Sequence, residues 1–299
     1  MTIQKHTRPL LMAAALLPAI HSAHAYNITI FDGVANNGGS SNPGDQAWWN
    51  NRNEDQETEP KTVHTQAWDL EAFDLSGSKL TMIGGYNFRA GESGYYSGDI
   101  FIDVHGDALY GPAADFDIPS GPNGYHRSAN LWNYDYVIHF HKQNSLVSDN
   151  GTPGDPSDDV YGTQLTGKYD IIDIRGRDVT LLTAFVDANE ASNPWRYEGG
   201  GRVVAANQDI LNWSSINTTY TDAQIQGAYG ISLLGGTHRT LEVDLSPLPK
   251  GVLFHYTMGC GNDNLMGRNV PDGGLTVGML GSGLLGLGLT CRALGRRQR

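Results

Sequence analysis

The sequence predicts an all-β protein, an antiparallel β-sandwich, and three observations support this fold class. Between residues 26 and 267, no run of apolar residues at helical spacing is longer than two turns. Short runs rich in β-branched and aromatic residues recur instead, separated by turn dipeptides such as Ser76-Gly77 and Asn150-Gly151. Hydrophobic residues make up 39% of the chain and charged residues 17%, and there are 38 glycines. This composition excludes a coiled coil or a long-helix protein.

Runs of this kind are expected to form strands in a single domain over residues 26–267. They are Tyr26–Phe31, Ala67–Asp74, Lys79–Phe88, Gly98–His105, Asp135–His141, Val160–Leu165, Val179–Val186, Arg202–Ala206, Gly227–Leu233, Thr240–Leu245 and Gly251–Met258. About ten strands without intervening helices predict two sheets packed face to face. In the run at 98–105, Ile100, Ile102 and Val104 alternate with Asp99 and Asp103. We therefore expect one face of this strand in the core and the other open to solvent.

The first 25 residues have the three parts of a secretory signal peptide. Lys5 and Arg8 precede an apolar stretch over residues 10–20, and the small residues Ala23 and Ala25 form a pattern that signal peptidase accepts. Cleavage after Ala25 would leave the mature chain to start at residue 26. An uncleaved membrane anchor is the alternative, but this apolar stretch is shorter than the roughly 20 residues that span a bilayer.

The last thirty residues contain a second segment typical of export. Residues 273–291 form a run of 19 positions without a charge, rich in Leu and Gly, and four arginines follow. This run is marginally long enough to be a transmembrane segment, and its basic flank would stay cytoplasmic under the positive-inside rule. The body of the protein would then lie outside, tethered by its tail.

Residues 268–299 as a whole resemble a known sorting signal. The short motif before the span consists of Val270, Pro271, Asp272, Gly273 and Gly274. With the Gly/Leu-rich span and the arginines, it is similar to the PEP-CTERM signal in the variant that reads Val-Pro-Asp-Ser-Gly, except that Gly273 replaces Ser. The resemblance implies processing by an exosortase, a membrane protease that cuts near the motif and releases the protein to the surface or extracellular polymer matrix of a Gram-negative bacterium. A plain C-terminal membrane anchor is the alternative.

The charge of the body limits the kinds of partner it is expected to bind, and its cysteine content indicates the role of its thiol. The chain has 20 Lys+Arg and 32 Asp+Glu, a net charge of -12, and residues 26–270 alone keep 14 and 31, a net charge of -17. Nucleic-acid binding needs clustered Lys and Arg, so the sequence predicts no nucleic-acid partner. The acidic balance favours divalent cations over anionic partners. Cys260 remains as one thiol in the mature chain, and its apolar context favours a small buried hydrophobe over a nucleophile.

The body carries a resemblance of its own. Residues 98–103, 133–138 and 253–263 are similar to segments of exported PEP-CTERM proteins, whose bodies end in a Phe-His-x-Thr-Met-x-Cys-Gly-Asn-Asp stretch. The first of these segments is also similar to strands of DOMON-like and carbohydrate-binding sandwiches. The resemblance implies a sandwich of the jelly-roll, lectin-like or DOMON-like kind. Fold analogy by itself assigns no substrate.

The best metal candidate is the acidic loop at residues 149–159. It offers the carboxylates of Asp149, Asp155, Asp158 and Asp159, with Gly and Pro residues to bend the chain. Ca²⁺ takes about six to eight oxygen ligands from sharply turning loops, although this spacing is not that of an EF-hand. The loop is therefore a candidate Ca²⁺ site, with a solvated acidic turn as the alternative.

Two further residue pairs have metal-ligating side chains. His139 and His141 lie two apart on an expected strand, so both rings should point to one face about 7 Å apart. A third ligand from a neighbouring strand would complete a Zn²⁺ or Cu²⁺ site. Asp103 and His105 have the same spacing. Exposed or hydrogen-bonded strand histidines without a metal are the alternative.

The sequence predicts no enzyme. It contains neither a Gly-x-Ser-x-Gly elbow nor a His-Glu-x-x-His motif. Glycoside hydrolysis needs two carboxylates about 5 to 10 Å apart, and the best-placed acid for it is Glu198, beside Trp195 and Tyr197. All six tryptophans lie in the body. Trp48 and Trp49, in a polar loop, are the two least easily explained as core residues and are candidates for stacking on a sugar.

Taken together, these features predict an exported, exosortase-processed protein of the cell surface or extracellular matrix, with a non-catalytic structural or interaction role. Its expected partners are signal peptidase and the exosortase. A carbohydrate-binding module that recognises exopolysaccharide is the first alternative, and a secreted hydrolase is the second. The sequence requires no cofactor, and Ca²⁺ at the acidic loop is the best candidate.

Overall fold

The computed structural model describes residues 25–27, 65–109, 125–148, 160–184, 193–249 and 253–268. Antiparallel strands dominate these ranges, which also contain one α-helix and two short 3-10 turns, η1 (Gln66–Trp68) and η4 (Trp213–Ser215). The prediction of an all-β fold is confirmed for the described part of the chain.

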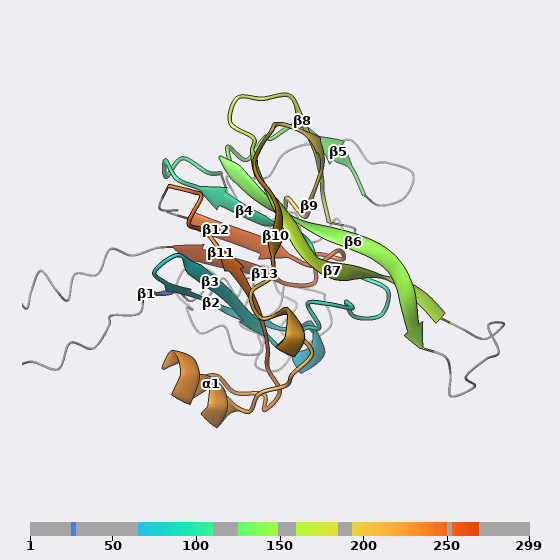
Figure 1. Cartoon of the computed structure of the whole chain (residues 1–299), viewed down its shortest axis with the longest axis vertical. Coiled ribbons are helices and arrows are strands. Elements are labelled where there is room, and N and C mark those ends of the chain that lie inside the picture. Colours follow the sequence, from blue (N-terminus) through green and yellow to red (C-terminus); the bar gives the residue numbers. More distant parts are fainter. Residues whose placement is uncertain are drawn as a thin grey trace, which may run out of the picture.

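The strands form three sheets, and all of their pairings are antiparallel (Figure 1). The first sheet has the order β1 (Ala25–Asn27), β2 (Leu70–Ser76), β3 (Lys79–Gly84), β11 (Arg239–Asp244). The second has the order β10 (Arg202–Asp209), β7 (Val160–Asp173), β6 (Tyr136–Ser148), β4 (Ile100–Asp103), β12 (Leu253–Thr257), β13 (Asn264–Arg268). The third has the order β5 (Arg127–Ser128), β8 (Val179–Leu182), β9 (Arg196–Gly200).

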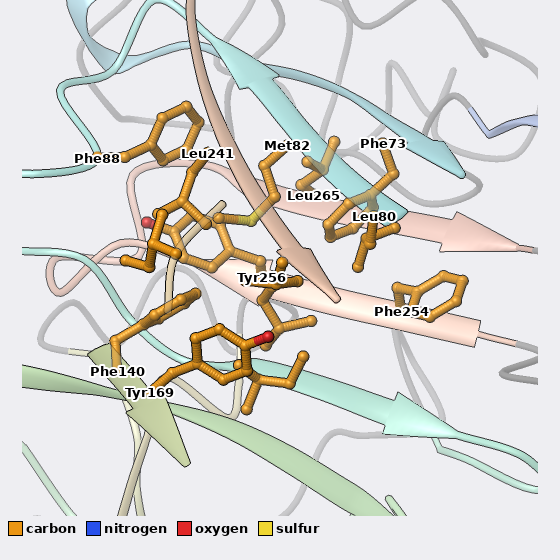
Figure 2. Packing of buried hydrophobic residues seen from close by; sticks show 14 of the residues in the cluster. Phe73, Leu80, Met82, Phe88, Phe140, Tyr169, Leu241, Phe254, Tyr256 and Leu265 are labelled. Atoms are coloured by element: carbon orange, nitrogen blue, oxygen red, sulfur yellow. The ribbon is translucent and has the colours of Figure 1, made fainter. Parts of the chain in front are cut away.

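The first and second sheets share the main hydrophobic core (Figure 2). Phe73 from β2 and Met82 from β3 belong to the same buried cluster as Phe140 from β6 and Phe254 from β12. The rings of Phe73 and Phe254 lie 5.9 Å apart across this core. Burying each such side chain contributes about 1.5–3 kcal/mol, so the contact between these two sheets is the main source of stability.

Each of the two large sheets is also covered on its outer face (Figure 1). On the first sheet, Ala72 and Ile83 pack against Ile225 of helix α1 (Asp222–Tyr229) and against Ile231 and Leu233, which follow it. On the second sheet, a separate cluster joins it to the third sheet. The cluster includes Phe101, Val137 and Ile172 from the second sheet with Val179 and Leu181 from β8.

This covering corrects the expectation that the strand at 98–105 has a wet face. Ile100 and Ile102 lie in the main core as predicted, but Asp99, Phe101 and Asp103 on the opposite face are at most 1% exposed. Alternation gives the two faces of a strand correctly. It carries no information about a further layer placed over the second face.

The expected strand at 227–233 is wrong, because residues 222–229 form α1 instead. Thr221 and Gln224 form a capping box at the N-terminus of the helix, and Gly230 ends it in the left-handed conformation with φ +74°. Strands β5, β9 and β13 were not expected from the sequence, and they lie in short, glycine-rich or polar segments.

The long β6–β7 hairpin contains an irregularity that positions polar side chains. Its register shifts between Phe140 and Lys142, as at a β-bulge, which redirects a side chain.

On β7, Gly167 has φ +87°, and a Cβ there would lie 2.7 Å from the indole of Trp213. Glycine is therefore required both by the backbone and by this close packing.

Candidate functional site

A polar pocket of about 410 Å³ lies where the segments after β4, before β6 and after β7 meet. Its polar lining consists of His105, Asp107, Asn130, Asn133, Asp135, Arg175 and Arg177. Backbone hydrogen bonds at Asp135 hold the three segments together, because its N–H donates to Ile102 O and its carbonyl accepts from Ile174 N–H, each at 2.9 Å. The pocket is therefore built on the ends of paired strands.

A histidine–aspartate pair forms one wall of the pocket. The Nδ1 atom of His105 lies 2.8 Å from Asp135 Oδ1, and Asp135 Oδ2 accepts a 2.6 Å hydrogen bond from Val104 N–H. The side chain of Asp135 is 6% exposed, whereas that of His105 is 57% exposed. The buried carboxylate thus orients an imidazole whose other edge faces solvent.

Asp103 contacts the backbone of His105 and not its ring. Asp103 Oδ1 accepts hydrogen bonds from the backbone N–H of His105 and Gly106, and its Oδ2 accepts one from Ala108 N–H. These contacts fix the loop after β4. Asp103 is therefore a scaffold residue, and Asp135, 30 residues away in the sequence, is the partner of the imidazole.

Three arginines surround the buried carboxylate of Asp173 next to the pocket. Arg175, Arg177 and Arg202 all donate to it, and Asp173 itself is 1% exposed. The hydrogen bonds, above all that from Arg175, hold the pKa of Asp173 well below its usual range. The guanidinium of Arg175 also lies 4.6 Å from the centre of the Tyr136 ring. Arg175 and Arg177 are thus held in place with some of their N–H donors left for a ligand.

A second polar cluster lies around Asp99, which is fully buried immediately before β4. Asp99 Oδ2 lies 2.9 Å from His139 Nδ1 and accepts a 2.9 Å hydrogen bond from Tyr197 N–H. Its Oδ1 accepts from Phe140 N–H at 3.0 Å and from Lys142 Nζ at 3.1 Å. One carboxylate therefore connects β4, β6 and β9.

The charges of this Asp99 cluster depend on one another. Burial raises the pKa of Asp99, but Lys142 and His139 outweigh burial and bring it well below its usual range. The side chain of Lys142 is 5% exposed, and burial lowers its pKa against the opposing effect of Asp99. Arg196 lowers the pKa of Lys142 further through its positive charge.

The predicted geometry of His139 and His141 is confirmed, since their ring centres lie 6.3 Å apart. Each ring has a carboxylate of its own. His139 pairs with Asp99, and the Nε2 of His141 lies 3.1 Å from Asp170 Oδ2. Among the residues that the structure describes, no group of three or more His, Cys, Asp and Glu is arranged to hold a metal ion.

Glu198 is placed poorly for the role of a general acid. Both of its carboxylate oxygens accept hydrogen bonds from the guanidinium of Arg127. The hydrogen bond from Arg127 is the main reason why the pKa of Glu198 lies below its usual value. A general acid at neutral pH needs a raised carboxyl pKa, so the pairing with Arg127 does not favour this role for Glu198.

The Phe-His-x-Thr-Met-x-Cys-Gly-Asn-Asp stretch is buried in the scaffold. The ring of His255 stacks on Tyr134, and its Nε2 lies 2.9 Å from Pro194 O. At the end of the stretch, Asp263 Oδ2 accepts a 2.6 Å hydrogen bond from the N–H of Leu70, which ties β2 to the turn before β13. Cys260 lies in the main core, as its sequence context predicts. This stretch therefore holds the sheets together.

The sequence reasoning missed a buried histidine bridge between α1 and the first sheet. The Nδ1 of His238 lies 2.6 Å from Glu71 Oε2 on β2, and its Nε2 lies 3.0 Å from Asp222 Oδ1 in the first turn of α1. The imidazole is fully buried. No local signal marks this residue, because its partners lie 167 and 16 positions away.

Several predicted features lie outside the described residues. They are residues 1–24 of the signal peptide, whose last residue Ala25 begins β1, the sorting motif with its apolar span, the acidic loop at 149–159, and Trp48 with Trp49. Within the described ranges, no helix is both long enough and apolar enough to cross a membrane. Comparison of the chain with protein-family models, curated proteins and solved structures finds no match.

Proposed function

We propose that the protein is exported, trimmed by an exosortase, and displayed at the cell surface or in the extracellular matrix, where its body has a non-catalytic interaction role. The observation that carries this proposal is the order of parts in the tail: the motif at 270–274, the uncharged run at 273–291 and the terminal arginines. The signal peptide at 1–25 supplies the matching start for export.

The architecture of the body is compatible with this role. Within the proposal, the two larger sheets form a β-sandwich of the jelly-roll, lectin-like or DOMON-like kind, to which α1 and the third sheet add outer layers. A buried core shared by these two sheets supports the sandwich assignment. Such a body is a rigid support on which loops and strand ends can present binding residues.

The sorting proposal is tested by changing the short motif. The full-length chain is expressed in a Gram-negative host that contains an exosortase, and its position and intact mass are followed. We expect the parent to lose its tail and reach the surface fraction, and a Pro271→Ala/Asp272→Ala variant to stay uncut in the inner membrane. Asp209→Ala, at an exposed carboxylate of the body, is the control and should be processed as the parent is. Normal processing of the motif variant would refute the proposal.

A carbohydrate-binding module is the second candidate, and the polar pocket favours it. Asn133, Asp135, His105 and two arginines offer fixed donors and acceptors around a volume suited to a sugar unit. In this reading, the ligand is an exopolysaccharide of the matrix. The pocket is polar and open at the surface, which suits hydroxyl-rich ligands better than apolar ones.

A glycan array with the full-length chain tests the second candidate. We expect binding by the parent and its loss on Asn133→Ala or Arg175→Ala, while the exposed Gln143→Ala variant on β6 serves as the control. The double variant Trp48→Ala/Trp49→Ala asks whether the polar loop adds a stacking surface. An array on which the parent binds nothing removes the carbohydrate proposal, and release of cleaved glycan would favour the third hypothesis, a secreted hydrolase.

A further inference from the structure

Arg196, at the start of β9, has a guanidinium group without a carboxylate partner among the described residues. Its Nη1 donates to Tyr96 Oη at 3.1 Å, while its Nε is buried and makes no hydrogen bond. Glu198 lies two positions along the same strand, but Arg127 occupies both of its oxygens. Withdrawing a charge from water is unfavourable unless another charge or hydrogen-bonding group replaces the lost hydration.

Arg196 is half-buried, and a cation whose side chain is buried lies close to it. Lys142 is near enough for the charge of Arg196 to lower its pKa, and Lys142 Nζ donates to the carboxylate of Asp99 and to Phe140 O. Residues 195–197 run directly alongside that carboxylate, because Asp99 N–H donates to Trp195 O at 3.0 Å and Asp99 Oδ2 accepts from Tyr197 N–H at 2.9 Å. The cations Lys142 and Arg196 therefore lie close together beside one buried carboxylate, which contacts Lys142, in a chain whose net charge is -12.

The residue before Arg196 has a second buried N–H donor without a hydrogen-bond acceptor. The indole Nε1 of Trp195 is buried and makes no hydrogen bond. Arg196 Nε and Trp195 Nε1 thus form a pair of N–H groups on consecutive residues without an acceptor. Buried donors nearly always have a partner in native proteins. An acceptor that carries negative charge would satisfy these donors and pair with the guanidinium of Arg196.

Aromatic rings lie around Trp195 and the guanidinium of Arg196. The ring of Tyr125 stacks on Trp195 with 4.7 Å between centres and 22° between planes, and the ring of Tyr96 lies 5.2 Å from Trp195. The guanidinium of Arg196 lies 5.7 Å from the centre of the Tyr96 ring. Tyr96 and Tyr125 are both partly exposed. Partly exposed tyrosines offer an apolar face and a polar tip to a ligand.

We propose that Arg196, Tyr96 and Tyr125 form a binding site for an acidic saccharide, with Arg196 taking the carboxylate of the sugar and the tyrosines contacting its ring. The guanidinium matches a carboxylate through paired N–H donors, which a neutral sugar does not use. This site rests on the proposed saccharide-binding function. It is separate from the polar pocket, because none of its three residues lines that pocket.

Calorimetry with the purified full-length chain tests the proposal, with tetragalacturonate as the probe and its methyl ester as the uncharged match. We expect the acid form to bind the parent at least about tenfold more tightly than the ester. Arg196→Gln should weaken binding of the acid form by a similar factor and leave binding of the ester unchanged. Lys168→Ala, which removes an exposed cation on β7, is the matched control and should bind as the parent does.

A second measurement guards against a variant that folds poorly. In the parent, the Nε–Hε NMR signal of Arg196 should move on addition of tetragalacturonate and stay in place on addition of the ester. An unmoved signal, equal affinity for acid and ester, or no binding of the acid form would each overturn the proposal. If Asn133→Ala abolishes binding of neutral glycans while Arg196→Gln changes nothing, this site is refuted and the saccharide-binding function survives.

Discussion

Asp99 Oδ1 accepts a 3.1 Å hydrogen bond from Lys142 Nζ, and both side chains are withdrawn from solvent. The register shift in β6 between Phe140 and Lys142 allows this contact, because it brings Lys142 to the carboxylate that His139 also reaches. Tyr197 N–H, on β9, donates to the same carboxylate. The pair therefore anchors the third sheet to the second.

Removing the charge of Asp99 should destabilise the body strongly. We expect Asp99→Asn to lower the free energy of unfolding by about 3–5 kcal/mol, because Lys142 is then left buried without its carboxylate. The double variant Asp99→Asn/Lys142→Met should recover most of this loss. Urea denaturation followed by circular dichroism measures both effects.

The control for the Asp99 variant is Asp209→Asn, which removes an exposed partner of Lys168 and should change stability little. The effect of Asp99 should also depend on pH. Its native pKa lies below the ordinary value of 3.8, so its contribution is present above that pH and is lost as the pH falls towards the native value. A loss for Asp99→Asn no larger than that of the control would contradict this account.

The His238 bridge predicts a pH dependence of the opposite sign. Burial lowers the pKa of His238, but the hydrogen bonds and charges of Glu71 and Asp222 outweigh burial and raise it above 6.5. The stabilisation from the charged imidazole is therefore present below pH 6.5 and is lost as the pH rises through the native pKa. We expect His238→Gln to cost about 2–3 kcal/mol near pH 6 and progressively less at higher pH.

Chemical denaturation of the parent and His238→Gln between pH 5.5 and 9 provides the measurement. The matched control is His105→Gln, whose imidazole is 57% exposed and also pairs with a carboxylate. It should shift stability by much less at every pH. A constant difference between the parent and His238→Gln across this range would show that the imidazole titrates alike in the folded and unfolded states.

Local patterns in the sequence predicted most of the strands, but they did not predict the layers that pack over the outer faces of the sheets. The alternation around Ile100 and Ile102 correctly placed these side chains in the core. It could not show that the third sheet covers the other face, because that contact depends on segments more than 70 positions away. The helix at 222–229 had a readable signal in Thr221 and Gln224, which the strand prediction at 227–233 overlooked.

The same limit applies to the polar clusters. The spacing of His139 and His141 gave the distance between their rings, since both lie on one strand. Their carboxylate partners, Asp99 and Asp170, come from neighbouring strands, and strand order cannot be read from composition. For Arg196, the sequence shows the flanking aromatic residues Trp195 and Tyr197. That its guanidinium pairs with no carboxylate among the described residues is visible only in the three-dimensional contacts.

Alanine substitutions at Gly167 and Gly77, compared with each other, distinguish the cost of backbone strain from the cost of steric overlap. Both have positive φ, +87° and +66°, so alanine at either position should cost about 1–2 kcal/mol from the backbone alone. A Cβ at Gly77 meets nothing within 4 Å, whereas one at Gly167 meets the indole of Trp213 at 2.7 Å. We expect Gly167→Ala to be the more damaging by at least about 1 kcal/mol in urea denaturation. Equal losses would show that Trp213 can move without cost.

The acidic loop at 149–159 remains a prediction for Ca²⁺. Calorimetric titration of the full-length chain should show binding that an Asp155→Ala/Asp158→Ala double variant loses, because the loop then keeps two of its four carboxylates. Asp209→Ala is the control for a general loss of negative charge. Absence of binding in the parent, or equal binding in the double variant, would remove the proposed site.

The most direct test of export and trimming is mass spectrometry of both termini of the protein recovered from its native cells. The account predicts a surface or matrix form that begins at Tyr26 and has lost the apolar run at 273–291 with the arginines behind it. Recovery of the chain from the cytosol with Met1 and Arg299 still attached would contradict it.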